Sequence, residues 1–327
     1  MISVVIPTWN GKQHLAHCLP SLQSQTVQDF QIVVVDNGSK DGTAAFLAEK
    51  FPKVKIIALK KNYGFSAAVN RGIAAASGEF IAVLNNDTQT EQHWLEQLLQ
   101  AAKENPGVDA FASKILSLTN LKIIDSAGDA YGRTGMAWNI GRGCPDGPAL
   151  DETRWVFGAA GCAAFYRRSF LDEVGWFDED FFAFYEDVDL AFRGQLLGKK
   201  CLYVPSAVVF HQGGGTLKHL SPMHIYYCSR NAPLVLVKNM PGQLLLKHFG
   251  RIAWTYAKHF VRHFIQKGHT WGVVRGYGSA LVNIPGMISK RAFIQRTRRI
   301  TNKELENILK SQEATLMTIK KDPRPER

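Results

Sequence analysis

Short apolar runs alternate with longer segments of helical periodicity over the first hundred residues of the chain. The apolar runs that predict strands cover residues 3–7, 31–35, 54–59 and 80–84. The segments that predict helices cover residues 12–25, 41–51, 64–76 and 91–105. Strands without an alternating polar face are typical of a parallel sheet that helices cover on both sides. The pattern therefore predicts an α/β fold with a mostly parallel central sheet and flanking helices.

The pattern is less regular beyond residue 105. Residues 114–155 are rich in glycine, residues 169–174 predict a helical turn, and residues 201–210 predict a strand that ends at His211. From about residue 216 the pattern is helical. Apolar residues recur at helical spacing between Lys247 and Gln266 with cationic residues beside them, which predicts a basic amphipathic helix. The apolar stripe of this helix is Phe249, Ile252, Ala253, Tyr256, Phe260 and Phe264.

Charge divides the chain into two unlike parts. Residues 1–189 contain 16 Lys/Arg and 23 Asp/Glu, a net of −7, whereas residues 190–327 contain 23 and 5, a net of +18. Such segregation implies an anionic partner, which is a membrane surface, a phosphorylated ligand or a nucleic acid. We predict an α/β domain over residues 1–215, a basic, membrane-peripheral helical region over residues 216–302, and a charged, partly disordered tail over residues 303–327.

Cysteine usage and the apolar runs limit where the protein acts. The five cysteines are scattered and lack CxxC spacing, which favours reduced thiols and argues against a zinc site or a disulfide framework. The N-terminus lacks the basic region of a signal peptide, and no apolar run reaches the roughly 18 residues that cross a bilayer. We expect a cytoplasmic protein, soluble or peripheral at the inner face of the membrane.

Three carboxylates, Glu186, Asp187 and Asp189, lie within four positions of one another in an aromatic-rich segment. Like charges beside apolar rings cost free energy unless a cation or a proton-transfer role offsets them. One of the three is therefore a candidate general base. The alternative is a helix start, where acidic residues in the first turn complement the helix dipole.

Polar residues follow the predicted strands at the edge where parallel sheets bind ligands. The segment Asn85-Asn86-Asp87 offers a carboxylate that fits Mg²⁺ or Mn²⁺, although such a sequence also forms ordinary turns. Asp36 fits either a nucleoside or a turn. His211 precedes a glycine run and is either a ligand or a structural residue. No phosphate-binding glycine fingerprint is present, which disfavours P-loop and dinucleotide chemistry.

Taken in order, these segments resemble a family 2 glycosyltransferase of the GT-A fold, in its rhamnosyltransferase-like branch. The resemblance covers roughly residues 2–215. It rests on four stretches that are similar to the donor site, on two that are similar to the acceptor and base side, and on one position where some members place a further metal ligand. The donor stretches are Val4–Gly11, Val34–Thr43, Asn62–Gly72 and Asn85–Asp87, and the others are Gly158–Gly161, Glu186–Arg193 and His211.

The resemblance implies a role for each matched position. Asp187 is the expected base with Glu186 beside it, and Asp87, Asn85 and His211 are the expected metal ligands. Here Asn85 replaces the first aspartate of the family's DXD motif. The expected nucleotide-sugar-binding residues are Pro7, Thr8, Asn10, Asp36, Asn37, Ser39, Asn62, Gly64, Asn70 and Asn86. The expected acceptor-side residues are Gly158, Gly161, Asp189 and Arg193.

The reaction implied is an inverting transfer from a nucleoside diphosphate sugar, dTDP- or UDP-linked, to a hydroxyl of a saccharide or lipid-linked saccharide, with Mg²⁺ or Mn²⁺. Rhamnose is the sugar that the branch suggests, and cell-surface polysaccharide synthesis is the setting. The basic helices would meet an anionic membrane surface. The alternatives are a non-catalytic nucleotide-sugar-binding protein and a nucleic-acid-binding protein. The second lacks a recognition motif, and the acidic N-terminal part would repel phosphates.

Overall fold

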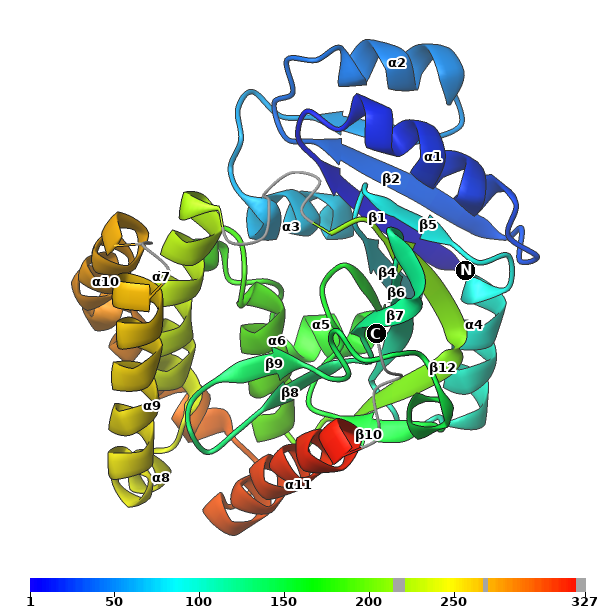
Figure 1. The fold of residues 1–327 in the computed structure, drawn as a ribbon. Helices are drawn as coiled ribbons and strands as arrows, with labels where there is room; N and C mark the ends of the chain where they lie inside the picture. The colour runs from blue at the N-terminus through cyan, green and yellow to red at the C-terminus, as the bar shows by residue number, and fades with distance from the viewer. Residues whose placement is uncertain (214–220, 267–269, 322–327) are drawn as a thin grey trace.

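A mixed sheet runs through the centre of the computed structural model, which describes residues 1–213, 221–266 and 270–321 (Figure 1). Ten strands of the described residues join it, and eight of them lie in the order β10-β12-β6-β11-β4-β1-β2-β3. The strands predicted from the first hundred residues are β1 (Ile2–Thr8), β2 (Phe30–Asp36), β3 (Lys55–Ala58) and β4 (Phe80–Leu84). The others are β5 (Thr88–Thr90), β6 (Ala110–Ser117), β7 (Asn120–Ser126), β10 (Arg154–Val156), β11 (Ala163–Arg167) and β12 (Cys201–His211).

The four predicted strands are parallel to one another, whereas β11 lies antiparallel between β4 and β6. Register places Thr8 of β1 beside Asp36 of β2, so the polar residues that follow these strands emerge at one edge. Two further strands, β8 (Asp129–Tyr131) and β9 (Ala137–Asn139), form a separate hairpin. The predicted central sheet is therefore present, with an antiparallel insertion.

Alternate side chains of β1 enter two different hydrophobic cores, which explains its unbroken apolar sequence. Val4 and Ile6 pack with one group of helices, and Val5 packs with another. The first group is α1 (Lys12–Gln23), α2 (Thr43–Lys50) and α4 (Trp94–Glu104). The second is α3 (Phe65–Ala75), α5 (Arg168–Val174) and α6 (Glu186–Leu196). Short 3-10 turns lie at Pro148–Leu150 and Glu179–Phe181.

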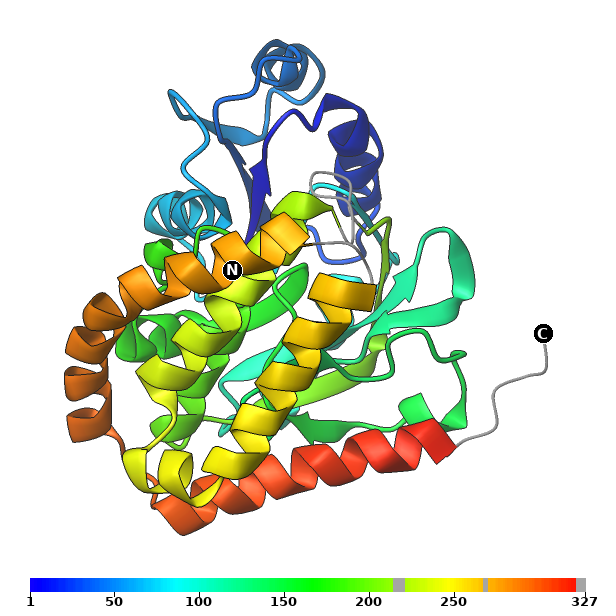
Figure 2. The ribbon, with the colours of Figure 1, turned by 60° about the vertical axis from the view of Figure 1, so that its left-hand side comes forward.

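Helices of the C-terminal part form a layer on the α6 side of the molecule (Figures 1 and 2). The layer begins with α7, which packs against α6 and along α10. Its helices are α7 (Pro222–Asn239), α8 (Gly242–Lys247), α9 (Phe249–Val261), α10 (Thr270–Thr297) and α11 (Asn302–Lys321), with a π-helical turn at Arg262–Gln266. Within the described residues, no helix combines the length and hydrophobicity that crossing a bilayer requires.

One expectation for the C-terminal part needs correction and another shifts only at its boundary. The amphipathic helix expected over residues 247–266 is present as α9 with the π-helical turn that continues it, and it begins at Phe249, after the buried His248. Within its stripe Ile252 is buried, but Phe249 is 67% exposed. Residues 303–321, expected as a partly disordered tail, form most of α11 because Leu305 and Leu309 are fully buried along its inner side. Residues 322–327 lie outside the described part of the chain.

Candidate active site

A cavity of about 1220 Å³ is lined by residues that follow β1, β2 and β4 and by the first residues of α6. It gathers most of the predicted site residues, which come from segments up to two hundred positions apart in the chain. The predicted residues that line it are Pro7, Thr8, Asn37, Asn62, Gly64, Asn85, Asn86, Asp87, Gly161, Glu186, Asp187 and His211.

Side-chain amides join the loops on the predicted nucleotide side of this cavity. Asn86 Nδ2 donates to Thr8 Oγ1 over 2.7 Å, which joins the loops after β4 and β1. Asn37 Nδ2 donates to Asn62 Oδ1 over 2.9 Å, which joins the loops after β2 and β3. Because these side chains fix one another, the edge of the sheet is preorganised before any ligand binds.

Four of the predicted nucleotide-binding residues lie outside the cavity lining and support it from behind. Asp36 is buried and accepts the N–H of Ser39 over 2.9 Å, and the N–H of Asn10 donates to Ser39 Oγ over 2.8 Å. Asn70 bonds the backbone of Phe177 in both directions, over 2.8 and 3.1 Å. Their direct contact with a nucleotide stays a prediction.

His211 at the end of β12 lies between two carboxylates. Its Nδ1 is 2.7 Å from Asp125 Oδ2, and its Nε2 is 3.3 Å from Asp87 Oδ1. Burial disfavours the imidazolium, but hydrogen bonds to Asp125 and Asp87 outweigh it and raise the pKa of His211 to about 9. Sequence reasoning missed Asp125, because it lies in the irregular stretch 114–155 and is 86 residues from its partner.

Asp87 and His211 supply a carboxylate oxygen and an imidazole nitrogen, which are donor types that Mn²⁺ accepts. Within the described residues no group of three or more His, Cys, Asp and Glu side chains is arranged to hold a metal ion. A cation could take both side chains as ligands only by displacing the proton that His211 shares with Asp87, and its remaining ligands would have to come from a diphosphate. Asp125 would orient the imidazole of His211, as carboxylates behind metal-bound histidines do.

Asp187, the second residue of α6, is held by two backbone N–H groups. Its Oδ2 accepts from Gly161 over 2.8 Å, and its Oδ1 accepts from Val188 over 2.8 Å. Burial raises the pKa of Asp187, while these two hydrogen bonds favour the carboxylate and oppose the rise. A Cβ at position 161 would lie 3.2 Å from Asp187 Oδ2, so a larger residue than glycine would crowd the carboxylate. A desolvated carboxylate in this setting is suited to accept a proton.

Glu186, the neighbour of Asp187 at the start of α6, has a different environment. It is 6% exposed, and its buried Oε2 makes no hydrogen bond to any residue that the structure describes. Burial, followed by the charge of Asp187, raises the pKa of Glu186 well above its usual range. The two neighbours therefore differ, because Asp187 has donors for its carboxylate and Glu186 is favoured in the protonated form.

The segment that leads into α6 has an unusual backbone. Phe182, Phe184 and Tyr185 all have positive φ, between 64° and 69°. Non-glycine residues in sparsely populated backbone regions cost on the order of 1–3 kcal/mol each and occur at functional sites. Asn231 of α7, which is fully buried, compensates by donating its side-chain amide to three carbonyls of this segment. They belong to Phe181, Ala183 and Phe184, at 2.9, 2.9 and 2.7 Å.

Asp189 and Arg193, predicted on the acceptor side, lie away from the cavity in a buried ion-pair network. Asp189 accepts from Arg193 Nε over 2.9 Å, from Lys238 Nζ over 2.7 Å and from Asn239 Nδ2 over 2.8 Å. Burial works against ionisation, but Lys238 and Arg193 lower the pKa of Asp189. Residues two positions apart on a helix lie on nearly opposite sides of it, so Asp187 lines the cavity whereas Asp189 lies against α7. The network ties α6 to α7.

Gly158 also lies outside the lining. A Cβ there would be 2.4 Å from the Cβ of Ala191, so the missing side chain lets the segment 158–161 lie against α6. Asp129 of β8 does line the cavity, and sequence reasoning missed it. Its signal was a lone carboxylate between glycine-rich turns, which is indistinguishable from a turn residue without the partners that the fold brings to it.

Comparison with known proteins identifies the family. Residues 3–175, more than half of the chain, match the family model for glycosyl transferase family 2. The chain belongs to this family. It is also 30% identical over 261 residues to the N-acetylglucosaminyl-diphospho-decaprenol L-rhamnosyltransferase of Mycobacterium tuberculosis, covering 68% of this chain and 81% of that protein. These matches confirm the prediction that the chain is a rhamnosyltransferase-like protein of glycosyltransferase family 2.

Other proteins are similar to the chain at lower identity. The chain is 26% identical to the chondroitin synthase of Pasteurella multocida, over 64% of this chain and 24% of that protein. The structure of S. aureus TarS matches with a TM-score of 0.56 at 17% identity, over 98% of this chain and 55% of that one. The structure of TarS 1-349 in complex with UDP matches with a TM-score of 0.55 at 19% identity, over 97% of this chain and 88% of that one. These structures confirm the predicted GT-A fold.

Proposed function

We propose that this family 2 glycosyltransferase catalyses an inverting transfer from a nucleoside diphosphate sugar to a hydroxyl of a lipid-linked saccharide in cell-surface polysaccharide synthesis. One observation carries the proposal. Asp187, half-buried and held by two N–H donors, shares a cavity with the loops after β1, β2 and β4. A base and a nucleotide-binding edge that face the same space are what a single displacement at a sugar carbon requires.

In the proposed mechanism, Asp187 accepts the proton of the acceptor hydroxyl as the hydroxyl oxygen attacks the anomeric carbon of the donor. The bond between that carbon and the diphosphate oxygen breaks, and the electron pair leaves with the nucleoside diphosphate. A single attack from the opposite side inverts the configuration. A positioned base of this kind typically contributes about 10²–10⁴ in rate.

For the metal, we propose that Asp87 and His211 hold Mg²⁺ or Mn²⁺ against the diphosphate, with Asn85 as a neutral neighbour. The cation would neutralise negative charge on the leaving diphosphate. The pair within the cavity supports this assignment, because a carboxylate and an imidazole lie 3.3 Å apart at the strand ends. Dialysis against a chelator should abolish sugar transfer, and Mn²⁺ or Mg²⁺ should restore it. Full activity of the metal-free protein would refute the role.

The relatives support a choice of donor and acceptor. The mycobacterial relative is named for a rhamnosyl transfer to N-acetylglucosaminyl-diphospho-decaprenol, and TarS was crystallised with UDP. We therefore propose a dTDP- or UDP-linked sugar, with rhamnose first, and a lipid-linked acceptor. A panel of nucleotide sugars, scored for nucleotide release with and without N-acetylglucosaminyl-diphospholipid, tests both choices.

We further propose that the protein acts in the cytoplasm, at the inner face of the membrane, through the outer sides of α9 and α10. These helices are neighbours, since the rings of Tyr256 and Tyr277 lie 6.5 Å apart. Large apolar side chains are exposed on them, including Trp254 at 72% and Trp271 at 77%. The sequence from residue 190 to residue 303 contains no acidic residue. Apolar side chains in a purely cationic setting favour an anionic bilayer as the partner.

The base assignment has a direct test. Asp187→Asn should abolish transfer while the affinity for the nucleoside diphosphate, measured by calorimetry, stays within about threefold of the wild type, because the amide cannot take a proton. Glu186→Gln is the matched control at the neighbouring position and should retain more activity. Near-normal turnover of Asp187→Asn would overturn the assignment. A protein that binds nucleotide but never releases it with any acceptor would instead be a sensor.

A further inference from the structure

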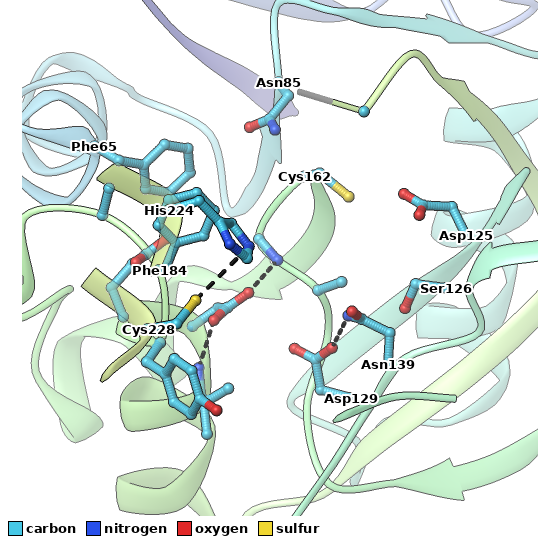
Figure 3. Close-up of a pocket in the computed structure, with 18 of the residues that line it drawn as sticks. Phe65, Asn85, Asp125, Ser126, Asp129, Asn139, Cys162, Phe184, His224 and Cys228 are labelled. Carbon is cyan, nitrogen blue, oxygen red and sulfur yellow. Dashed lines mark hydrogen bonds between the residues drawn. The ribbon is translucent and has the colours of Figure 1, made fainter. Parts of the chain in front are cut away.

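Asp129 is a buried carboxyl group inside the cavity that the proposed reaction leaves without a role. It begins β8 and is 3% exposed. Figure 3 shows it among the lining residues, on the side of Asn139 and Ser126 and across from the segment around Cys228. It reaches the cavity from the β8–β9 hairpin, whereas the base reaches it from α6.

The backbone and one side-chain oxygen of Asp129 are firmly held. Its N–H donates to the carbonyl of Gly158 over 2.8 Å, and the N–H of Gly158 donates back over 3.2 Å. Its Oδ1 accepts from Asn139 Nδ2 over 2.7 Å. Three positions along the chain from Gly158, Gly161 donates its N–H to Asp187. One short segment therefore fixes both carboxyl groups, so their relative position is rigid.

The second oxygen of Asp129 has no partner. Oδ2 is buried and makes no hydrogen bond within the described residues. An unsatisfied buried polar atom costs about 1–3 kcal/mol, more if it is charged, so a native protein keeps one only for a reason. Burial and the nearby charge of Asp187 raise the pKa of Asp129 well above its usual range, against Asn139 and Arg142. This lining residue therefore keeps one carboxyl oxygen that no described residue satisfies, in surroundings that favour the protonated form.

A structural role explains Oδ1 but not Oδ2. A role as the base suits Asp187 better, because only Asp187 has two N–H donors that stabilise its carboxylate. We propose that Asp129 binds the acceptor sugar, donating a hydrogen bond from Oδ2 to a hydroxyl next to the one that Asp187 deprotonates. This inference rests on the proposed glycosyl transfer and identifies a residue that determines acceptor specificity.

The test compares Asp129→Asn with Asp129→Ala in the full-length protein. The asparagine variant keeps a carbonyl oxygen for Asn139 and offers N–H groups to the acceptor, so its KM for N-acetylglucosaminyl-diphospholipid should stay within about threefold of the wild type. The alanine variant should raise that KM roughly tenfold, which corresponds to one lost hydrogen bond. The KM for the donor should change less than the KM for the acceptor in both variants. Glu152→Ala, at an exposed carboxylate, is the control.

A series of monodeoxy acceptors supplies a readout that a merely structural role would not move. The wild type should lose roughly tenfold in kcat/KM on the analogue that lacks the contacted hydroxyl, and Asp129→Ala should lose nothing further on that analogue. Equal acceptor KM values for Asp129→Ala and the wild type would overturn the inference alone. A loss of turnover in Asp129→Asn as large as that of Asp187→Asn would also overturn it. If the wild type transfers sugar to no acceptor, the proposed function itself fails.

Discussion

Substituting Lys238 should destabilise the fold strongly, because its ammonium group neutralises the carboxylates of both Asp178 and Asp189. Its Nζ lies 2.7 Å from Asp178 Oδ2 and 2.7 Å from Asp189 Oδ2, and its side chain is 3% exposed. Removing one partner of a buried ion pair destabilises by about 3–5 kcal/mol, since the other charge stays buried. Lys290 still contacts Asp178, and Arg193 still contacts Asp189. We therefore expect Lys238→Met to lower the free energy of unfolding by about 3 kcal/mol.

Urea denaturation followed by circular dichroism measures this loss. Lys50→Met is the matched control, because the Lys50–Glu49 pair lies at the surface with side chains 60% and 70% exposed, and it should leave the unfolding midpoint unchanged. Adding Asp189→Asn to Lys238→Met should recover part of the loss, because the uncompensated charge is removed together with its partner. A loss below about 1 kcal/mol for Lys238→Met, the range of exposed pairs, would refute the reasoning.

Three further predictions concern the pH dependence of stability, the two glycines beside α6 and the membrane contact. Burial opposes ionisation of Asp178 and Asp189, but Lys238 outweighs it and lowers the pKa of both carboxyl groups. Their contribution to stability is therefore complete above the pKa of an unfolded aspartate, about 3.9, and is lost as the pH falls below that pKa. The melting temperature should drop between pH 7 and pH 3, and it should drop less in Lys238→Met. Gly161→Ala should displace the Asp187 carboxylate and lower kcat at least tenfold, while the affinity for the nucleotide is retained. Gly158→Ala should instead lower the melting temperature, because its Cβ would clash with Ala191. Equal losses of kcat in the two variants would contradict the separate roles of the two glycines. Trp254→Ser should weaken sedimentation with vesicles containing anionic lipid, and unchanged sedimentation would exclude α9 from the contact.

The fold followed from the sequence where burial left a clear pattern. The strands β1, β2 and β4 are covered on both faces, so their sequences are unbroken apolar runs that end where polar residues begin. The cavity could be predicted for the same reason, since parallel strands end at one edge. Asp187 could be placed at a helix start, where it is found.

The remaining parts of the site depend on contacts between distant segments. Asp125 acts through His211, 86 residues away, and Asn231 supports carbonyls 47 to 50 residues away. No local pattern reveals such partners. The role of Asp189 was within reach of the sequence, because helical geometry separates it from Asp187 and leaves Arg193 one turn further on the same side.

The last described helix changes what counts as the catalytic part of this protein. Leu316 and Ile319 of α11 line the cavity, and Glu313 of the same helix bonds Arg133, which lies in the hairpin that carries Asp129. Its charge pattern predicted a partly disordered tail. In three dimensions it forms part of the cavity wall, so removing residues 302–321 would open the cavity to water beside the β8–β9 hairpin while leaving the loops after β1, β2 and β4 in place. Minimal versions made for crystallisation or screening should therefore keep every residue through 321.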